Sequence, residues 1–127
     1  MADGLFLAVV GVVQVVFELL SYYAATGPYG DTFAGSPYIV GWVEAHGLAA
    51  IVGIALLSVA TRDGRRFWHV MAAVVHVLLG SANLVFFDAF IAWGLVPAGV
   101  ASTVAHVVFV IAHVAAYAVS RDAVRQR

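Results

Sequence analysis

Several polar residues lie inside long apolar stretches of this 127-residue chain, where such side chains are rare, among them Gln14, Glu18, His46, His76, His106 and His113. Neutral imidazole is a common ligand of heme iron and of divalent transition metals. A carboxylate beside an imidazole can also bind and release a proton near neutral pH. The residue types therefore point to a cofactor, a metal ion or proton transfer in apolar surroundings.

Helical spacing gathers these residues on a few faces. Gln14 and Glu18 are four residues apart and share one face of a helix. Further along the chain, His76 and Asn83 are seven residues apart. We expect His69, one heptad before His76, to lie at a membrane interface, because it directly follows two arginines and two aromatic residues.

The depth of each residue can be compared if the last two apolar stretches form a hairpin. With a turn near residues 94–97, His76 lies level with His113, and Asn83 lies level with His106. The other polar residues fall near the same two levels: Gln14 at the first, and Glu18 and His46 at the second. The sequence thus predicts a polar interior in two layers.

The first interpretation of this interior is a heme site used in electron transfer or heme-dependent redox chemistry. Its axial ligands would be His76 with His113 or, as a second pair, His46 with His106. The remaining polar residues would handle protons in catalysis: Glu18 and Gln14.

The histidine pattern resembles that of b-type membrane cytochromes, which implies heme b as the cofactor. In architecture it also resembles one four-helix half of heme A synthase, whose halves carry histidines on alternate helices. The glutamate and histidine of that family are more widely spaced than Glu44-Ala45-His46 of this chain. The resemblance therefore concerns architecture.

Other functions fit the same residues. A divalent transition metal could be bound, in a membrane enzyme acting on a lipid-soluble substrate, by four residues of one level: Glu18, His46, Asn83 and His106. A proton- or ion-coupled transporter could use Glu18 and the histidines. An accessory subunit of a larger membrane complex would need no site at all.

Composition decides the class of protein. Hydrophobic residues make up 64% of the chain and charged residues 10%, and the mean hydropathy is +1.01. Soluble domains carry about 25% charged residues, so this chain belongs in a lipid bilayer. The absence of cysteine excludes disulfides and thiolate metal sites, and the net charge of −1 gives no reason to expect a nucleic-acid partner.

Four apolar runs are each long enough to span about 30 Å of hydrocarbon: approximately 5–25, 38–60, 67–93 and 97–120. They predict an all-α fold, a single domain over 1–127 that forms a four-helix transmembrane bundle with up-down-up-down topology. A quinone or another lipid-soluble substrate, a second copy of the chain, and a larger membrane complex are the possible partners.

Charge predicts the orientation. All six basic residues are arginines, and they occur only between the second and third spans and in the C-terminal tail: Arg62, Arg65, Arg66, Arg121, Arg125 and Arg127. The loop 27–37 on the other side carries Asp31 and no basic residue. The positive-inside rule then predicts a multi-pass protein of the plasma membrane with both termini in the cytoplasm.

Overall fold

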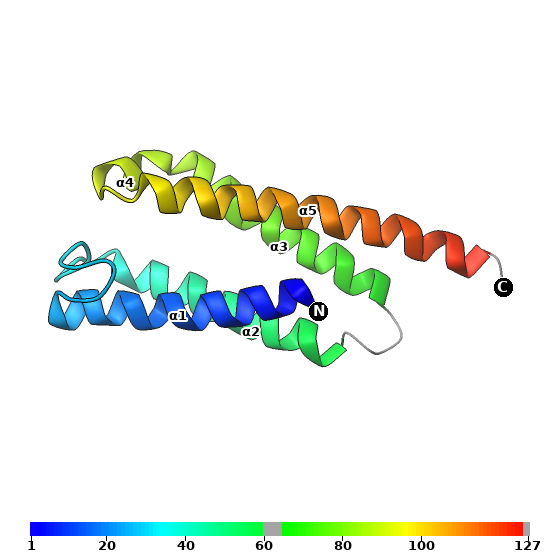
Figure 1. Cartoon of the computed structure of the whole chain (residues 1–127), viewed down its shortest axis with the longest axis horizontal. Helices are drawn as coiled ribbons and strands as arrows, with labels where there is room; N and C mark the ends of the chain where they lie inside the picture. The colour runs from blue at the N-terminus through cyan, green and yellow to red at the C-terminus, as the bar shows by residue number, and fades with distance from the viewer. Residues whose placement is uncertain (60–64, 126–127) are drawn as a thin grey trace. The chain divides into compact units, whose positions relative to one another are not determined.

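The computed structural model describes residues 1–59 and 65–125, which are helical apart from the connecting loops (Figure 1). The helices are α1 (Ala2–Ala24), α2 (Ile39–Val59), α3 (Arg65–Val85), α4 (Phe87–Ala92) and α5 (Val96–Arg125). All except α4 are long and apolar enough to cross a membrane. The all-helical class and four candidate spans are thereby confirmed.

The bundle topology and the sides on which the termini lie stay predictions. Two of the arginines that orient the chain, Arg62 and Arg127, lie outside the described residues, as does residue 60 at the expected end of the second span. The chain folds as two compact units, Met1–Thr61 and Arg62–Arg127. The single domain over 1–127 also stays a prediction.

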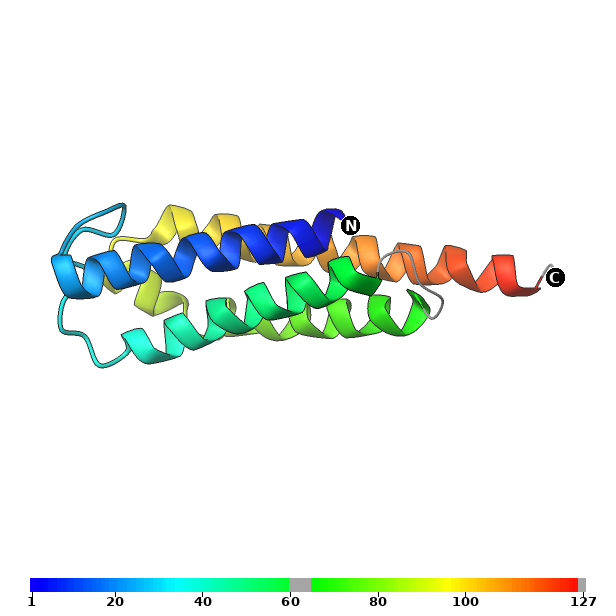
Figure 2. The same ribbon diagram turned by 90° about the horizontal axis from the view of Figure 1, so that it is seen from below.

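In the first unit, α1 and α2 form an antiparallel hairpin, and they lie side by side in both views (Figures 1 and 2). Glycines on both helices permit the close approach. A Cβ atom placed on Gly11 would lie 2.6 Å from the carbonyl oxygen of His46, and one on Gly53 would lie 2.3 Å from the amide nitrogen of Ala8. Small residues at such crossings let two helix backbones touch, as is common in membranes.

The second unit is a hairpin of α3 and α5, with α4 at the turn. The expected third span, 67–93, is wrong as one continuous helix. The backbone leaves the helix at Phe86, with φ −108° and ψ 30°, and resumes as α4. This break lets the buried Phe90 ring pack on Gly99 of α5, where an added Cβ would lie 2.7 Å from the ring.

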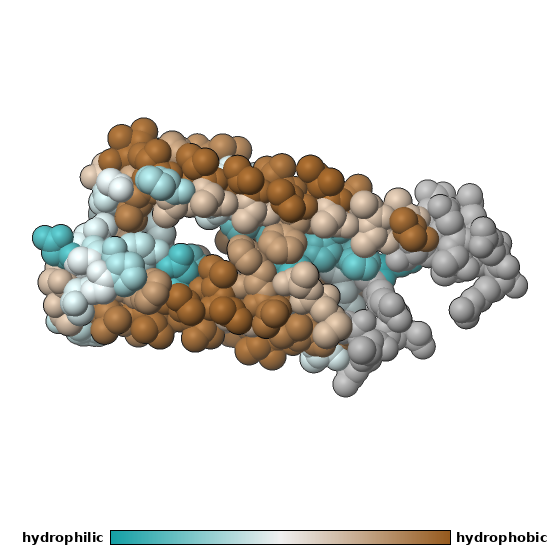
Figure 3. Space-filling view, in the orientation of Figure 1, coloured by the Kyte–Doolittle hydropathy of each residue, from teal (hydrophilic) through white to brown (hydrophobic). Residues whose placement is uncertain are grey.

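Apolar side chains cover much of the visible surface of each unit (Figure 3). On α2, for example, Leu48, Ile51 and Ile54 share one face and are 60–63% exposed. Apolar exposure of this extent is unfavourable in water and suits the hydrocarbon of a bilayer. The surface therefore agrees with a multi-pass membrane protein.

The close contact of α1 and α2 at Gly53 should be important for the stability of the first unit. Gly53→Ala should destabilise the first unit by about 1–3 kcal/mol, because the new methyl group overlaps the α1 backbone. The measurement is the thermal midpoint of helix loss, followed by circular dichroism in detergent.

Gly47→Ala on the same helix is the matched control. Among the described residues, nothing lies within 4 Å of a Cβ at Gly47. Alanine is the better helix former, so this variant should keep or slightly raise the midpoint. Equal effects of the two substitutions would contradict the close crossing.

Candidate functional site

The first unit brings together Glu18 of α1 and His46 of α2. Glu18 Oε1 lies 2.5 Å from His46 Nδ1, and the Glu18 side chain is fully buried. The contact forms because Gly11, two turns before Glu18, lets the α1 backbone touch α2 at His46 itself. The imidazole of His46 therefore points toward α1, and it contacts Glu18, the residue expected at the same depth in the membrane.

The loop between α1 and α2 is tied down near this pair. Ser21, a fully buried residue one turn after Glu18, accepts a hydrogen bond from the backbone amide of Phe33, with N and Oγ 3.0 Å apart. The Tyr29 hydroxyl donates a hydrogen bond to Gln14 Oε1. The loop is therefore anchored to α1 on both sides of Glu18.

Three aromatic rings lie near the Glu18–His46 pair. Phe33 is fully buried, and its ring centroid lies 5.4 Å from that of Tyr29 and 5.3 Å from that of Trp42. The Trp42 ring in turn lies 5.9 Å from the imidazole of His46. An aromatic ring thus lies beside the imidazole of a pair whose carboxylate is fully buried and whose imidazole is 25% exposed. Electrostatic interactions of the buried carboxylate are strong because little water screens them.

The surroundings of Tyr29 change the pKa of its phenol. Burial raises the pKa of Tyr29 above its ordinary value of 10.0, and the charge of Glu18 raises it further. The hydrogen bond to Gln14 acts in the opposite direction and lowers the pKa. Tyr29 therefore belongs to the same electrostatic site as Glu18, although it lies in the loop.

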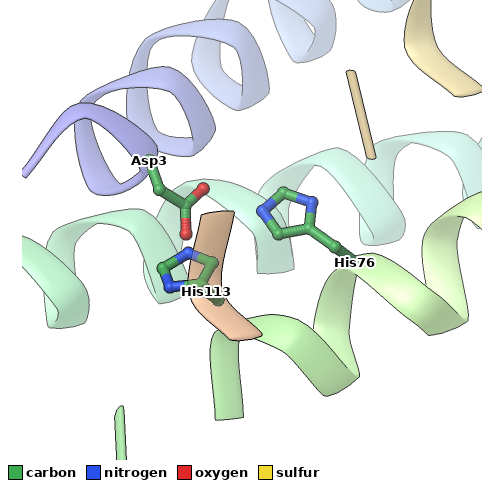
Figure 4. Close-up of side chains that lie close together, drawn as sticks. All are labelled: Asp3, His76 and His113. Atoms are coloured by element: carbon green, nitrogen blue, oxygen red, sulfur yellow. The ribbon is translucent and has the colours of Figure 1, made fainter. Parts of the chain in front are cut away.

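The second unit holds four histidines in a row between α3 and α5. Nδ1 of His76 lies 2.9 Å from Nδ1 of His106, and Nδ1 of His69 lies 3.0 Å from Nδ1 of His113. The rings of His76 and His113 stack with their centroids 6.2 Å apart and their planes at 18°, so they join the two pairs. Figure 4 shows these two rings, from α3 and α5; the Asp3 side chain drawn with them belongs to the first unit. We call His69, His113, His76 and His106 the histidine chain.

Neighbouring residues shape the histidine chain. Gly80 leaves room for His106, because a Cβ on this glycine would lie 3.2 Å from the His106 Cβ. The Phe109 ring stacks on His76, with the centroids 4.9 Å apart and the planes at 14°. Gly80 and His76 are buried, whereas Phe109 and His106 are partly exposed.

Polar contacts continue the row at both ends. Asn83 of α3 donates a hydrogen bond to Ser102 of α5, with Nδ2 and Oγ 2.9 Å apart. Near the other end, the Arg66 guanidinium lies 4.5 Å from the centre of the Tyr117 ring in a cation–π contact. Polar or cationic contacts thus occur at four levels of the α3–α5 interface.

The pairing of α3 with α5 is shifted from the expected one, by seven residues at His76 and by four at Asn83. The Nδ1 partner of His76 is His106 rather than His113, whose ring stacks on it, and Asn83 meets Ser102 rather than His106. The reason is the break at Phe86, which ends α3 early and moves the turn of the hairpin toward the N-terminus. Residues of α3 consequently face residues four to seven positions earlier in α5.

Two site residues are not predicted by the sequence: Tyr29, which lies in a loop, and His69. The arginines and aromatic residues before it suggested an interface position, yet its ring pairs with His113. The heptad spacing of His69, His76 and Asn83 was the signal that would have included it.

The other expected ligand sets stay predictions. The metal set joined two residues of the first unit, Glu18 and His46, with two of the second, His106 and Asn83. The second heme pair, His46 and His106, is divided in the same way.

The spacing of the paired nitrogens indicates which chemistry fits the histidine chain. A shared proton fits as it stands, because one imidazole Nδ1 donates and the other accepts at 2.9–3.0 Å. A tetrahedral metal with bonds of about 2.0–2.1 Å would hold two nitrogens about 3.3 Å apart, so each pair would have to open slightly. A macrocycle between paired rings would require α3 and α5 to separate, and heme binding has no support in this arrangement.

Comparison of the chain with models of protein families, with curated proteins and with solved structures found no match. The two sites therefore stand on their own geometry.

The electrostatic link between Tyr29 and Glu18 is testable by titration. The phenolate absorbance of Tyr29 should appear above pH 10.0 and should shift to lower pH in Glu18→Gln, because the carboxylate charge that raises the pKa is gone. The difference between the wild-type and Tyr29→Phe titration curves isolates this residue from the other tyrosines. An unchanged Tyr29 curve in Glu18→Gln would separate the phenol from the carboxylate.

Proposed function

We propose that this chain is a multi-pass membrane protein that transfers protons along the histidine chain of its second unit. The observation that carries the proposal is the pair of Nδ1–Nδ1 contacts, 2.9 and 3.0 Å long, joined by the stacked rings of His76 and His113. Four imidazoles then follow one another in the order His69, His113, His76 and His106.

Imidazole suits this task because it has two ring nitrogens. A neutral ring accepts a proton at one nitrogen and releases the proton already held at the other. In each pair one proton lies between the two Nδ1 atoms, and turning of the stacked His76 and His113 rings passes an added proton from one pair to the next.

A charged imidazole in a membrane interior is costly unless its surroundings compensate. Two features of the histidine chain reduce that cost. A second imidazole shares the added proton through a charge-assisted hydrogen bond, which is stronger than a neutral one. The face of the Phe109 ring, stacked on His76, attracts a cation.

The histidine chain covers part of the thickness of a bilayer. From His69 to His76 it covers seven residues of α3, which is about 10 Å at 1.5 Å per residue. The hydrocarbon core is about 30 Å thick. The histidine chain would therefore form the inner part of a proton path along the membrane normal, and two linked imidazole pairs support such a path more than a single isolated proton-binding site.

The cell membrane in which the protein lies, the orientation of its termini and its partners are also part of the proposal. The arginine distribution supports a plasma membrane location with both termini in the cytoplasm. A quinone, a second copy of the chain or a larger complex would be a partner that supplies or consumes the protons.

The prediction concerns proton flux in liposomes. Purified protein reconstituted with an internal pH dye should acidify the vesicles when a potassium diffusion potential, negative inside, is imposed. His76→Phe should reduce the rate by at least about tenfold, because an aromatic ring of similar shape cannot accept a proton. His106→Phe should have the same effect.

Leu78→Phe is the matched control, since it adds the same ring to a position of α3 that is 68% exposed. Its flux should equal that of the wild type. Flux no greater than in empty vesicles, or flux unaffected by His76→Phe, would disprove proton transfer. An absorption spectrum with a Soret band that His76→Phe removes would instead favour the heme interpretation.

A further inference from the structure

The Glu18 carboxylate of the first unit has one oxygen without a partner. Oε1 contacts His46, but Oε2 is buried and makes no hydrogen bond with any of the described residues. A buried carboxylate oxygen that is left without a hydrogen bond is unfavourable in apolar surroundings. A group that binds Oε2 would therefore stabilise the site.

Nitrogen and oxygen donors surround this carboxylate. His46 Nδ1 lies 2.5 Å from Oε1, so the two would separate to about 3.3 Å around a tetrahedral metal ion. The half-buried Tyr29 phenol is within the influence of the charge of Glu18. Gln14, one turn before Glu18 on the same face of α1, holds the phenol through its Oε1. One carboxylate, one imidazole, one phenol and one amide oxygen thus lie along a single side of the hairpin.

This donor set is selective among cations. Ca²⁺ and Mg²⁺ bind mainly through oxygen, usually with several carboxylates or waters. The site offers one carboxylate and one imidazole, the mixed donors typical of Zn²⁺ and similar divalent transition metals. A fully buried carboxylate also favours binding of a cation over an anion.

We infer that the first unit contains a binding site for a divalent transition-metal ion of the zinc class, with Glu18 and His46 as its primary ligands and Tyr29 and Gln14 as further oxygen donors. The loop 25–38 supplies the phenol and closes the site, since its Phe33 amide is anchored on Ser21. The site uses no residue of the histidine chain, so it is independent of proton transfer in the second unit.

The first experiment measures metal content and affinity. The full-length protein in detergent is stripped with a chelator and titrated with ZnCl₂, and bound zinc is counted by elemental analysis. The wild type should bind one zinc ion more than Glu18→Gln, which has the same shape without the charge. His46→Gln should weaken the affinity of this ion by at least about tenfold.

Trp42 provides a local readout, because its ring lies 5.9 Å from that of His46. Co²⁺, used in place of zinc, should quench part of the tryptophan fluorescence in the wild type. The quenching should disappear in Glu18→Gln and in Trp42→Phe. It should survive in Glu44→Gln, which removes an exposed carboxylate from the same helix.

His76→Phe separates the two units in this experiment. Zinc that remains bound in His76→Phe and is lost in Glu18→Gln supports the site, whatever the proton flux. Zinc that is lost in His76→Phe and retained in Glu18→Gln overturns it, as does equal zinc in the wild type and Glu18→Gln. Circular dichroism of each variant checks that the helices are intact.

Discussion

The structure depends on one constraint: a polar group that enters hydrocarbon must find its partner within the protein. Water is absent from the bilayer core, so an unpaired carboxylate or imidazole there would cost several kcal/mol. Both units pair polar side chains of neighbouring helices, Glu18 with His46 in the first and His76 with His106 in the second. Oε2 of Glu18 remains without a partner among the described residues. The pairs then determine which helix faces must meet, because apolar contacts alone favour one lipid-like face as much as another.

Glycine makes room beside a histidine in both units, for the approach of the backbone in the first and for the side chain in the second. Gly11 of α1 lies against the backbone of His46, and Gly80 of α3 lies against the side chain of His106. A glycine therefore accompanies a histidine in both hairpins. Polar pairing and close helix packing are two aspects of one arrangement, because the hydrogen bonds form only when the backbones come close.

Much of the fold and part of both sites could be predicted from the sequence. Hydropathy and length predict four apolar helices, and helical periodicity predicts that Glu18 and His46 face inward, since both signals are local. Two features depended on tertiary contacts. Packing of the Phe90 ring on Gly99 of α5 favours the break at Phe86, and that break changes the pairing between α3 and α5. Tyr29 joins the site through a loop whose path is set by hydrogen bonds to α1, and no periodicity describes such a loop.

The short helix α4 has a consequence for the histidine chain. His69 and His76 on α3 have the same seven-residue spacing as His106 and His113 on α5, so two antiparallel helices can match these residues in more than one register. In the observed register all four rings find partners; a displacement of seven residues would leave a single imidazole pair. The residues from Phe86 to Leu95 form the turn that selects between these registers. The length of this turn thus sets the register of α3 against α5. It determines how many imidazoles are connected, although the turn contains no histidine.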